Sequence, residues 1–133
     1  MGAEVIKVEA CGTGDLARNL GSDPQLNTAG MGVSFLAQNA GKKSVTVNLK
    51  SDEGKALFLR LVKTADVLVE NFRPGVMKRL GLDYPVLKDA NPELIYCAIS
   101  GFGQDGPWVE RPAYDQIIQG ISGLMSVTGD DET

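Results

Sequence analysis

Histidine is absent from this sequence of 133 residues. Histidine is the side chain most often used to move protons near neutral pH, and it is a common metal ligand. Its absence excludes histidine acid–base catalysis, serine–histidine triads and histidine-ligated metals within this chain. Any chemistry that the chain performs must use carboxylates, lysine, tyrosine, cysteine or main-chain dipoles.

Cysteine is also scarce. Only Cys11 and Cys97 occur, and they form neither a CxxC pair nor any other metal-binding spacing. We therefore expect two reduced thiols, as in a cytoplasmic protein, and no metal site.

Excess basic charge and long apolar runs are lacking as well. The chain has 13 lysine and arginine residues against 17 aspartate and glutamate residues, a net charge of −4. This balance excludes a general nucleic-acid binder, although basic residues gathered locally could still hold an anion. No apolar run approaches the roughly 20 residues of a membrane span, and no signal-peptide pattern opens the chain. The composition predicts a cytoplasmic protein that binds neither nucleic acid nor membrane.

Strand and helix patterns alternate along the chain, which is long enough for one domain. Strands are expected at residues 4–8, 44–49, 67–69 and 94–99, and helices at 51–64, 75–80, 84–90 and 114–126. In the last helix, Ile117, Ile118, Ile121 and Leu124 should face the core. The alternation predicts an α/β fold with a Rossmann-like, mainly parallel sheet, flanking helices and right-handed crossovers.

Residues 10–41 are rich in glycine and predict a long loop with one short helix near residues 33–38. Within this region, Gly12–Ala17 fits the pattern G-x-G-x-x-A after a strand. A nicotinamide site also requires an acidic residue about 20 positions later, at the end of the next strand. No acidic residue lies between Asp23 and Asp52. A dinucleotide-dependent oxidoreductase is therefore disfavoured, whereas a glycine-rich loop near some phosphate is retained.

The stretch Asp66–Val76 organises the rest of the chain. Its apolar run breaks into Glu70, Asn71, Phe72 and Arg73, and Pro74 then suits the first turn of a helix. Polar groups at the carboxyl end of a buried strand lie where open α/β proteins bind ligands. A turn with solvated charges is the simpler alternative for the same pattern.

Five segments together resemble the class III CoA-transferases, a family that includes formyl-CoA transferase and the carnitine-pathway CoA-transferases. The family shares its fold with α-methylacyl-CoA racemase. The segments occur in the family's order and cover nearly the whole chain: Gly2–Glu9, Lys42–Val45, Asp66–Val76, Leu94–Cys97 and Ser100–Pro107.

The resemblance implies transfer of CoA from an acyl-CoA to a carboxylic acid through an aspartate nucleophile and an aspartyl-CoA thioester. CoA and acyl-CoA are then substrates, no cofactor is tightly bound, and the family's intertwined homodimer is expected. Because CoA carries several phosphate charges, an acidic protein needs a local basic cluster to bind it. Candidates for that cluster are Lys42, Lys43, Lys50, Arg73 and Arg79.

Individual positions match the family's CoA-binding segments. By resemblance, residues 47–50, with Val47, Asn48 and Lys50, border the CoA nucleotide, and Lys42 lies nearby. Asn71, Phe72 and Arg73 match the segment along the CoA chain, Arg79 matches a phosphate contact, and Tyr114 matches a position facing the active site.

The sequence departs from the family in three places. Ala10 and Cys11 replace an Arg-Pro pair near the nucleotide, and the family has a further strand and helix ahead of Gly2. The family's nucleophilic aspartate lies beyond Thr133. Three other aspartates do not occupy that position: Asp115, which is expected to support a helix start, and Asp130 and Asp131 in an acidic turn. We therefore expect residues 1–133 to be a partial large domain, incomplete at both ends and inactive alone.

Two alternatives remain beside the transferase. A racemase of this fold would use a histidine where this chain has Tyr114, and a phenol is a poor base at neutral pH. A non-catalytic association module derived from the same domain would keep an assembly surface without catalysis. CoA binding without turnover would favour the transferase interpretation over the association module.

Overall fold

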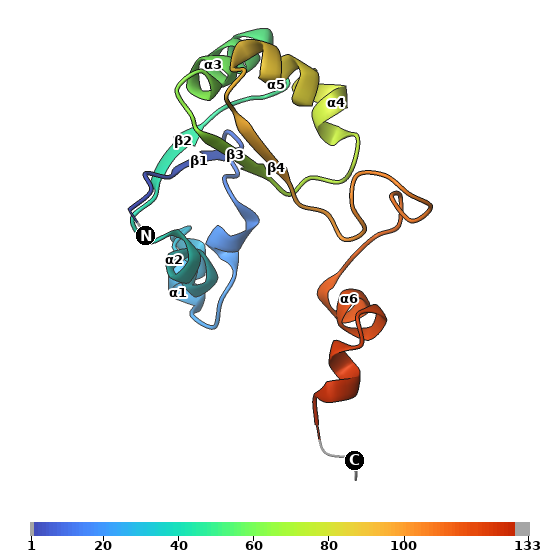
Figure 1. The fold of residues 1–133 in the computed structure, drawn as a ribbon. Coiled ribbons are helices and arrows are strands. Elements are labelled where there is room, and N and C mark those ends of the chain that lie inside the picture. The colour runs from blue at the N-terminus through green and yellow to red at the C-terminus, as the bar shows by residue number, and fades with distance from the viewer. Residues whose placement is uncertain (1, 130–133) are drawn as a thin grey trace. The chain divides into compact units, whose positions relative to one another are not determined.

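The computed structural model describes residues 2–129, in which short strands alternate with helices along the chain (Figure 1). The chain divides into two units, Met1–Arg60 and Leu61–Thr133, and helix α3 (Asp52–Val62) crosses the boundary. Each unit contains one pair of parallel strands. The predicted α/β fold with parallel strands is confirmed. The expected turn at Asp130 and Asp131 lies outside the described residues.

In the first unit, strand β1 (Ile6–Glu9) pairs with strand β2 (Lys43–Thr46), so that Ile6 lies opposite Lys43 and Glu9 opposite Thr46. In β1 the apolar Ile6 is exposed, whereas the charged Glu9 at the strand's end is buried. Two buried aromatic side chains of this unit, Phe35 and Phe58, come from helices.

The glycine-rich region between these strands is more ordered than its sequence predicts. Besides the expected helix, α2 (Val33–Asn39), it contains the 3₁₀ helix η1 (Leu16–Asn19) and helix α1 (Pro24–Thr28). Asp15 caps η1 by accepting a hydrogen bond from the Ala17 amide at 2.8 Å, and Asp23 caps α1 ahead of Pro24. The two additional helices were not expected, because helices of four or five residues show no hydrophobic periodicity.

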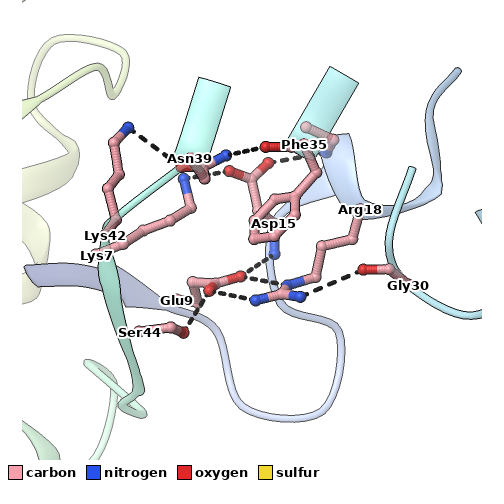
Figure 2. Close-up of polar contacts among 10 residues, drawn as sticks. Lys7, Glu9, Asp15, Arg18, Gly30, Phe35, Asn39, Lys42 and Ser44 are labelled. Carbon is pink, nitrogen blue, oxygen red and sulfur yellow. Dashed lines mark hydrogen bonds and ion pairs between the residues drawn. The ribbon is translucent and has the colours of Figure 1, made fainter. Parts of the chain in front are cut away.

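A buried carboxylate, Glu9, ties this region to strand β1. Only 5% of Glu9 is exposed, and Arg18 grips both of its oxygens (Figure 2). Arg18 Nε donates to Oε2 and Nη2 donates to Oε1, each at 2.7 Å. This paired geometry is the strongest arrangement available to an arginine and a carboxylate.

Two further donors complete the Glu9 site. The Asp15 amide donates to Oε2 at 2.9 Å, and the Ser44 hydroxyl of β2 donates to Oε1. The hydrogen bond from Arg18, followed by the others, lowers the pKa of Glu9 from 4.5 to about 2, although burial opposes this shift. Glu9 is therefore ionised and fully bonded at neutral pH.

Arg18 extends these contacts to the helices. Its guanidinium stacks over the Phe35 ring of α2 at 3.9 Å, and its Nη1 donates to the Gly30 carbonyl at 3.3 Å. Lys7 of β1 pairs with Asp15, the residue that caps η1 (Figure 2). The end of β1, the following turn and α2 are thus joined through one arginine.

In the second unit, strand β3 (Val67–Glu70) pairs in parallel with strand β4 (Ile95–Ala98), with Val67 opposite Ile95. Helices α4 (Val76–Leu80) and α5 (Tyr84–Ala90) connect them. The Asn91 side chain donates to the carbonyls of Val62 and Ala65 and closes the end of α3. The buried apolar residues of this unit are Val62, Met77, Leu82, Leu87 and Leu94.

The predicted helix over residues 114–126 is broken into α6 (Asp115–Ile121) and the 3₁₀ helix η2 (Leu124–Val127). Gly123, with φ 82°, separates the two. The prediction that this helix faces the core was wrong for Ile117, Ile121 and Leu124, which are exposed. Helix α6 packs mainly against η2, and no strand of residues 2–129 covers its apolar side.

In the described part of the chain, no helix is long and apolar enough to span a membrane. The longest, α3, has 11 residues.

We predict that Glu9→Gln lowers the free energy of unfolding by about 2 kcal/mol at neutral pH, because it removes hydrogen bonds to a buried charge. The pKa of Glu9 in the folded chain, about 2, lies below its ordinary value of 4.5. The stabilisation is therefore present above pH 4.5 and is lost as pH falls toward 2. Urea unfolding followed by circular dichroism across this pH range measures both effects.

The matched control is Glu4→Gln, since Glu4 pairs with Lys43 at 2.7 Å with both side chains mostly exposed. Such a pair contributes no more than about 1 kcal/mol. Equal destabilisation by the two variants would contradict the central role of Glu9.

Candidate functional site

An open hollow of about 280 Å³ lies beyond the carboxyl ends of β3 and β4. Three segments line it: the turn after β3, the residues directly after β4, and the residues ahead of α6. The lining residues are Asn71–Pro74, Ser100, Gly101 and Pro112–Tyr114. The structure therefore brings together four residues that the sequence predicted for one site: Asn71, Phe72, Arg73 and Tyr114.

The turn after β3 is held to the end of β4 by Asn71. Its Nδ2 donates to the Ile99 carbonyl at 2.8 Å. Because the two strands are parallel, their carboxyl ends meet at this edge, where a ligand can contact residues of both. Phe72 follows Asn71 and is 43% exposed.

The turn leads into α4 through Pro74 and Gly75. Gly75 adopts φ 80°, a conformation that favours glycine, and its carbonyl accepts from the Arg79 amide at 3.0 Å. The Arg79 guanidinium lies over this residue, because a Cβ built on Gly75 would be 3.2 Å from Arg79 Nη1. Arg79 is thus placed beside the turn that contains Arg73.

Neither Arg73 nor Arg79 forms an ion pair with a carboxylate of residues 2–129. Arg18, in contrast, is fully engaged by Glu9. Two unpaired guanidinium groups beside one turn attract an anionic ligand, and they can hold phosphate oxygens with paired hydrogen bonds.

The segment ahead of α6 contacts the end of β4 very closely. A Cβ built on Gly101 would lie 1.9 Å from the Cβ of Ala113, so only glycine allows this approach. Tyr114 follows as the residue preceding α6, with 64% of its surface exposed. Asp115 begins α6, and its Oδ2 accepts from Gln119 Nε2, a contact within the helix.

The other predicted site residues belong to the first unit. Lys42 Nζ donates to Asn39 Oδ1 at 3.2 Å, and Lys43 pairs with Glu4. Asn48 Oδ1 accepts from the Lys50 amide at 3.1 Å and shapes the turn after β2. Val47 is 4% exposed, so its side chain is part of the core and only its main chain could face a ligand.

Sequence reasoning missed two arrangements. The pairing of Glu9 with Arg18 was not predicted, although an acidic residue ending an apolar strand is a signal for a buried, paired charge. Tyr96, which contacts Glu70 at the end of β3, was also missed.

Metal ligands are not clustered in this part of the protein. Within residues 2–129, no three histidine, cysteine, aspartate or glutamate side chains gather as they would around a metal ion. Cys11 and Cys97 are both free thiols and both exposed.

The hollow lies at the carboxyl ends of two parallel strands, the edge at which open α/β proteins bind ligands, and Arg73 lines it while Arg79 lies beside the same turn. The family model of CoA-transferase family III matches residues 1–133. The chain therefore belongs to CoA-transferase family III.

Curated relatives of this chain are CoA-transferases. Acetyl-CoA:oxalate CoA-transferase of Acetobacter aceti is 50% identical over 97% of this chain and 32% of its own length. Succinate–glutarate CoA-transferase of Agrobacterium fabrum is 47% identical over 99% of this chain and 34% of its own length. The chain thus spans about a third of the length of these relatives.

A solved structure agrees with this assignment. The crystal structure of a CAIB/BAIF family protein from Brucella suis matches with a TM-score of 0.85 and 42% identity. The match covers 99% of this chain and 35% of the solved chain.

We predict that Gly101→Ala lowers the free energy of unfolding by about 1–3 kcal/mol, because the added methyl group collides with Ala113. Combining it with Ala113→Gly should restore most of this loss by removing the colliding methyl. Thermal and urea unfolding measure both variants.

Gly120→Ala, within α6, provides the control. The nearest atom to its added Cβ would be Met125 Sδ at 3.8 Å, so this variant should be no less stable than the unmodified chain. Failure of Ala113→Gly to rescue Gly101→Ala would contradict the close contact.

Proposed function

We propose that this chain is the CoA-binding part of an acyl-CoA:carboxylate CoA-transferase. The observation that carries the proposal is the pair of unpaired guanidinium groups, Arg73 and Arg79, beside the hollow at the ends of β3 and β4. Membership of CoA-transferase family III supplies the chemical class of the ligand.

CoA would lie with its chain along Asn71–Arg73. The exposed Phe72 ring offers an apolar surface to that chain, and Arg73 and Arg79 offer charge to the phosphates. Lys42, Asn48, Lys50 and the main chain of Val47 are proposed to border the nucleotide, which rests on the resemblance alone.

The acceptor would be a small dicarboxylate. The names of several relatives give oxalate, glutarate or malate as a carboxylate in the exchange, and each of these is a dicarboxylate. Tyr114, which lines the hollow, would face the reacting groups and offer a hydroxyl to the acceptor.

Transfer itself would use an aspartate nucleophile and an aspartyl-CoA thioester, as in the family that the chain resembles. By the same resemblance that aspartate would correspond to a position beyond Thr133, so this chain alone would bind CoA without transferring it. Family resemblance also supports a homodimer in the cytoplasm, with no tightly bound cofactor.

Two other functions rank lower. A racemase of this fold would need a histidine where this chain has Tyr114, and the named relatives cited above are transferases. The non-catalytic association module is favoured by the apolar side of the second strand pair, where Val69 and Ile95 are 62% and 63% exposed. An oligomeric chain without CoA affinity would support that module instead.

We predict that the 133-residue chain binds CoA and that Arg73→Ala or Arg79→Ala weakens binding roughly tenfold, the loss expected for a charged contact to phosphate. Added salt should weaken binding by the unmodified chain as well, because it screens the charges. Isothermal titration calorimetry with CoA at two salt concentrations measures both effects.

Lys63→Ala is the matched control, since Lys63 is an exposed cation of the same unit that does not line the hollow. Its affinity for CoA should equal that of the unmodified chain. A loss in Lys63→Ala as large as in the arginine variants would show nonspecific attraction and refute this site.

We also predict that the chain by itself catalyses no exchange of CoA between succinyl-CoA and glutarate. By resemblance the proposed nucleophile would lie outside residues 1–133, whereas CoA binding would need only the contacts proposed above. The measurement is chromatographic detection of glutaryl-CoA. The succinate–glutarate CoA-transferase of Agrobacterium fabrum serves as the positive control. Turnover by this chain would overturn the assignment of the nucleophile.

A further inference from the structure

A carboxylate at the end of β3 connects two parts of the second unit. Glu70 Oε2 accepts a hydrogen bond from the Phe72 amide at 2.6 Å. Its other oxygen, Oε1, accepts from the Tyr96 hydroxyl of β4 at 2.9 Å. The chain of contacts therefore runs from Tyr96 through Glu70 to the main chain of the turn that lines the hollow.

Strand register explains how these side chains meet. Tyr96 lies opposite Leu68, and Glu70 lies opposite Ala98. Glu70 and Leu68 are two residues apart and share one face of the strand pair, so Tyr96 and Glu70 are diagonal neighbours on that face. A long aromatic side chain can reach a diagonal neighbour at this spacing.

Tyr96 is itself held in place. Its ring stacks on the ring of Tyr84 at the start of α5, with centroids 5.7 Å apart and planes at 24°. Burial, followed by the hydrogen bond to Glu70, raises the pKa of Tyr96 to about 12. The phenol therefore remains a protonated donor to Glu70 throughout the physiological pH range.

Glu70 and Tyr96 do not line the hollow that contains Asn71 and Tyr114. They line a second hollow of about 290 Å³, together with Tyr84, while Arg73 borders both. A ligand in the first hollow would touch the turn but not Glu70 or Tyr96. The hydrogen bond from the Phe72 amide to Glu70 links these two residues to that ligand through the main chain of the turn.

We propose that Glu70 and Tyr96 are positioning residues for CoA, which hold the Phe72 amide so that Phe72 and Arg73 are oriented toward the ligand before it binds. This proposal rests on the proposed CoA site. Asn71 attaches the turn to Ile99 on one side, and Glu70 attaches the next residue on the other. A turn attached at both residues loses less conformational freedom on binding, which improves affinity.

The test uses three variants of the full chain. Tyr96→Phe removes only the hydroxyl and keeps the ring stacked on Tyr84. Glu70→Gln keeps one acceptor oxygen but loses the charge, and Glu70→Ala removes both. The matched control is Tyr84→Phe, which removes a hydroxyl from the stacked partner without touching Glu70.

We expect Tyr96→Phe and Glu70→Gln to weaken CoA binding roughly fivefold to tenfold. Glu70→Ala should bind CoA more weakly still, and Tyr84→Phe should bind it with the affinity of the unmodified chain. Hydrogen exchange of the Phe72 amide, followed by NMR without CoA, should accelerate in the same order. The thermal unfolding midpoint of Tyr96→Phe should stay near that of the unmodified chain, which separates positioning from a general loss of stability.

Several results would overturn the proposal. Unchanged CoA affinity in Tyr96→Phe and Glu70→Gln would refute positioning while the CoA site stands. Equal losses in Tyr84→Phe, or a lost unfolding transition in Tyr96→Phe, would show a purely structural role. Absence of CoA binding by the unmodified chain would overturn the proposed function, and the positioning role would fall with it.

Discussion

The buried pair of Glu9 and Arg18 is the interaction on which the first unit depends. A carboxylate that is 5% exposed is stable only if its charge and its lone pairs are satisfied, and four donors satisfy them here. Those donors come from the turn after β1, from η1 and from β2. Because one carboxylate joins them, the glycine-rich region adopts a defined conformation although Phe35 is its only buried large apolar side chain.

The second unit uses a carboxylate in the same place. Glu70 ends β3 as Glu9 ends β1, and each accepts a hydrogen bond from a main-chain amide in the segment that follows. The difference lies in the partner: Arg18 neutralises Glu9, whereas the neutral Tyr96 hydroxyl binds Glu70. Arg73 and Arg79 are left without carboxylate partners in the described chain, which suits them to an anionic ligand.

Much of this organisation was predicted from the sequence, because it depends on local signals. The parallel α/β fold followed from the alternation of elements, and the family followed from five segments in order. The turn at Asn71–Arg73 was also located correctly, since polar residues end an apolar strand there. The helices η1 and α1 were missed because each has only four or five residues. Each is defined by an aspartate cap that bonds amides two or three residues away, and not by a periodic apolar face. The apolar face of α6 was predicted to be buried, but in the described part of the chain its residues Ile117 and Ile121 are exposed.

The sequence by itself determined the class of fold, the family and the residue types available for chemistry. Because histidine is absent, it excluded histidine acid–base catalysis and histidine-ligated metals within this chain. Only the tertiary structure decided which side chains meet. Glu9 and Ser44 are 35 positions apart, and Glu70 and Tyr96 are 26 apart. Hydrogen bonds between such positions depend on strand register and on side-chain direction, and both are set by packing across the whole unit.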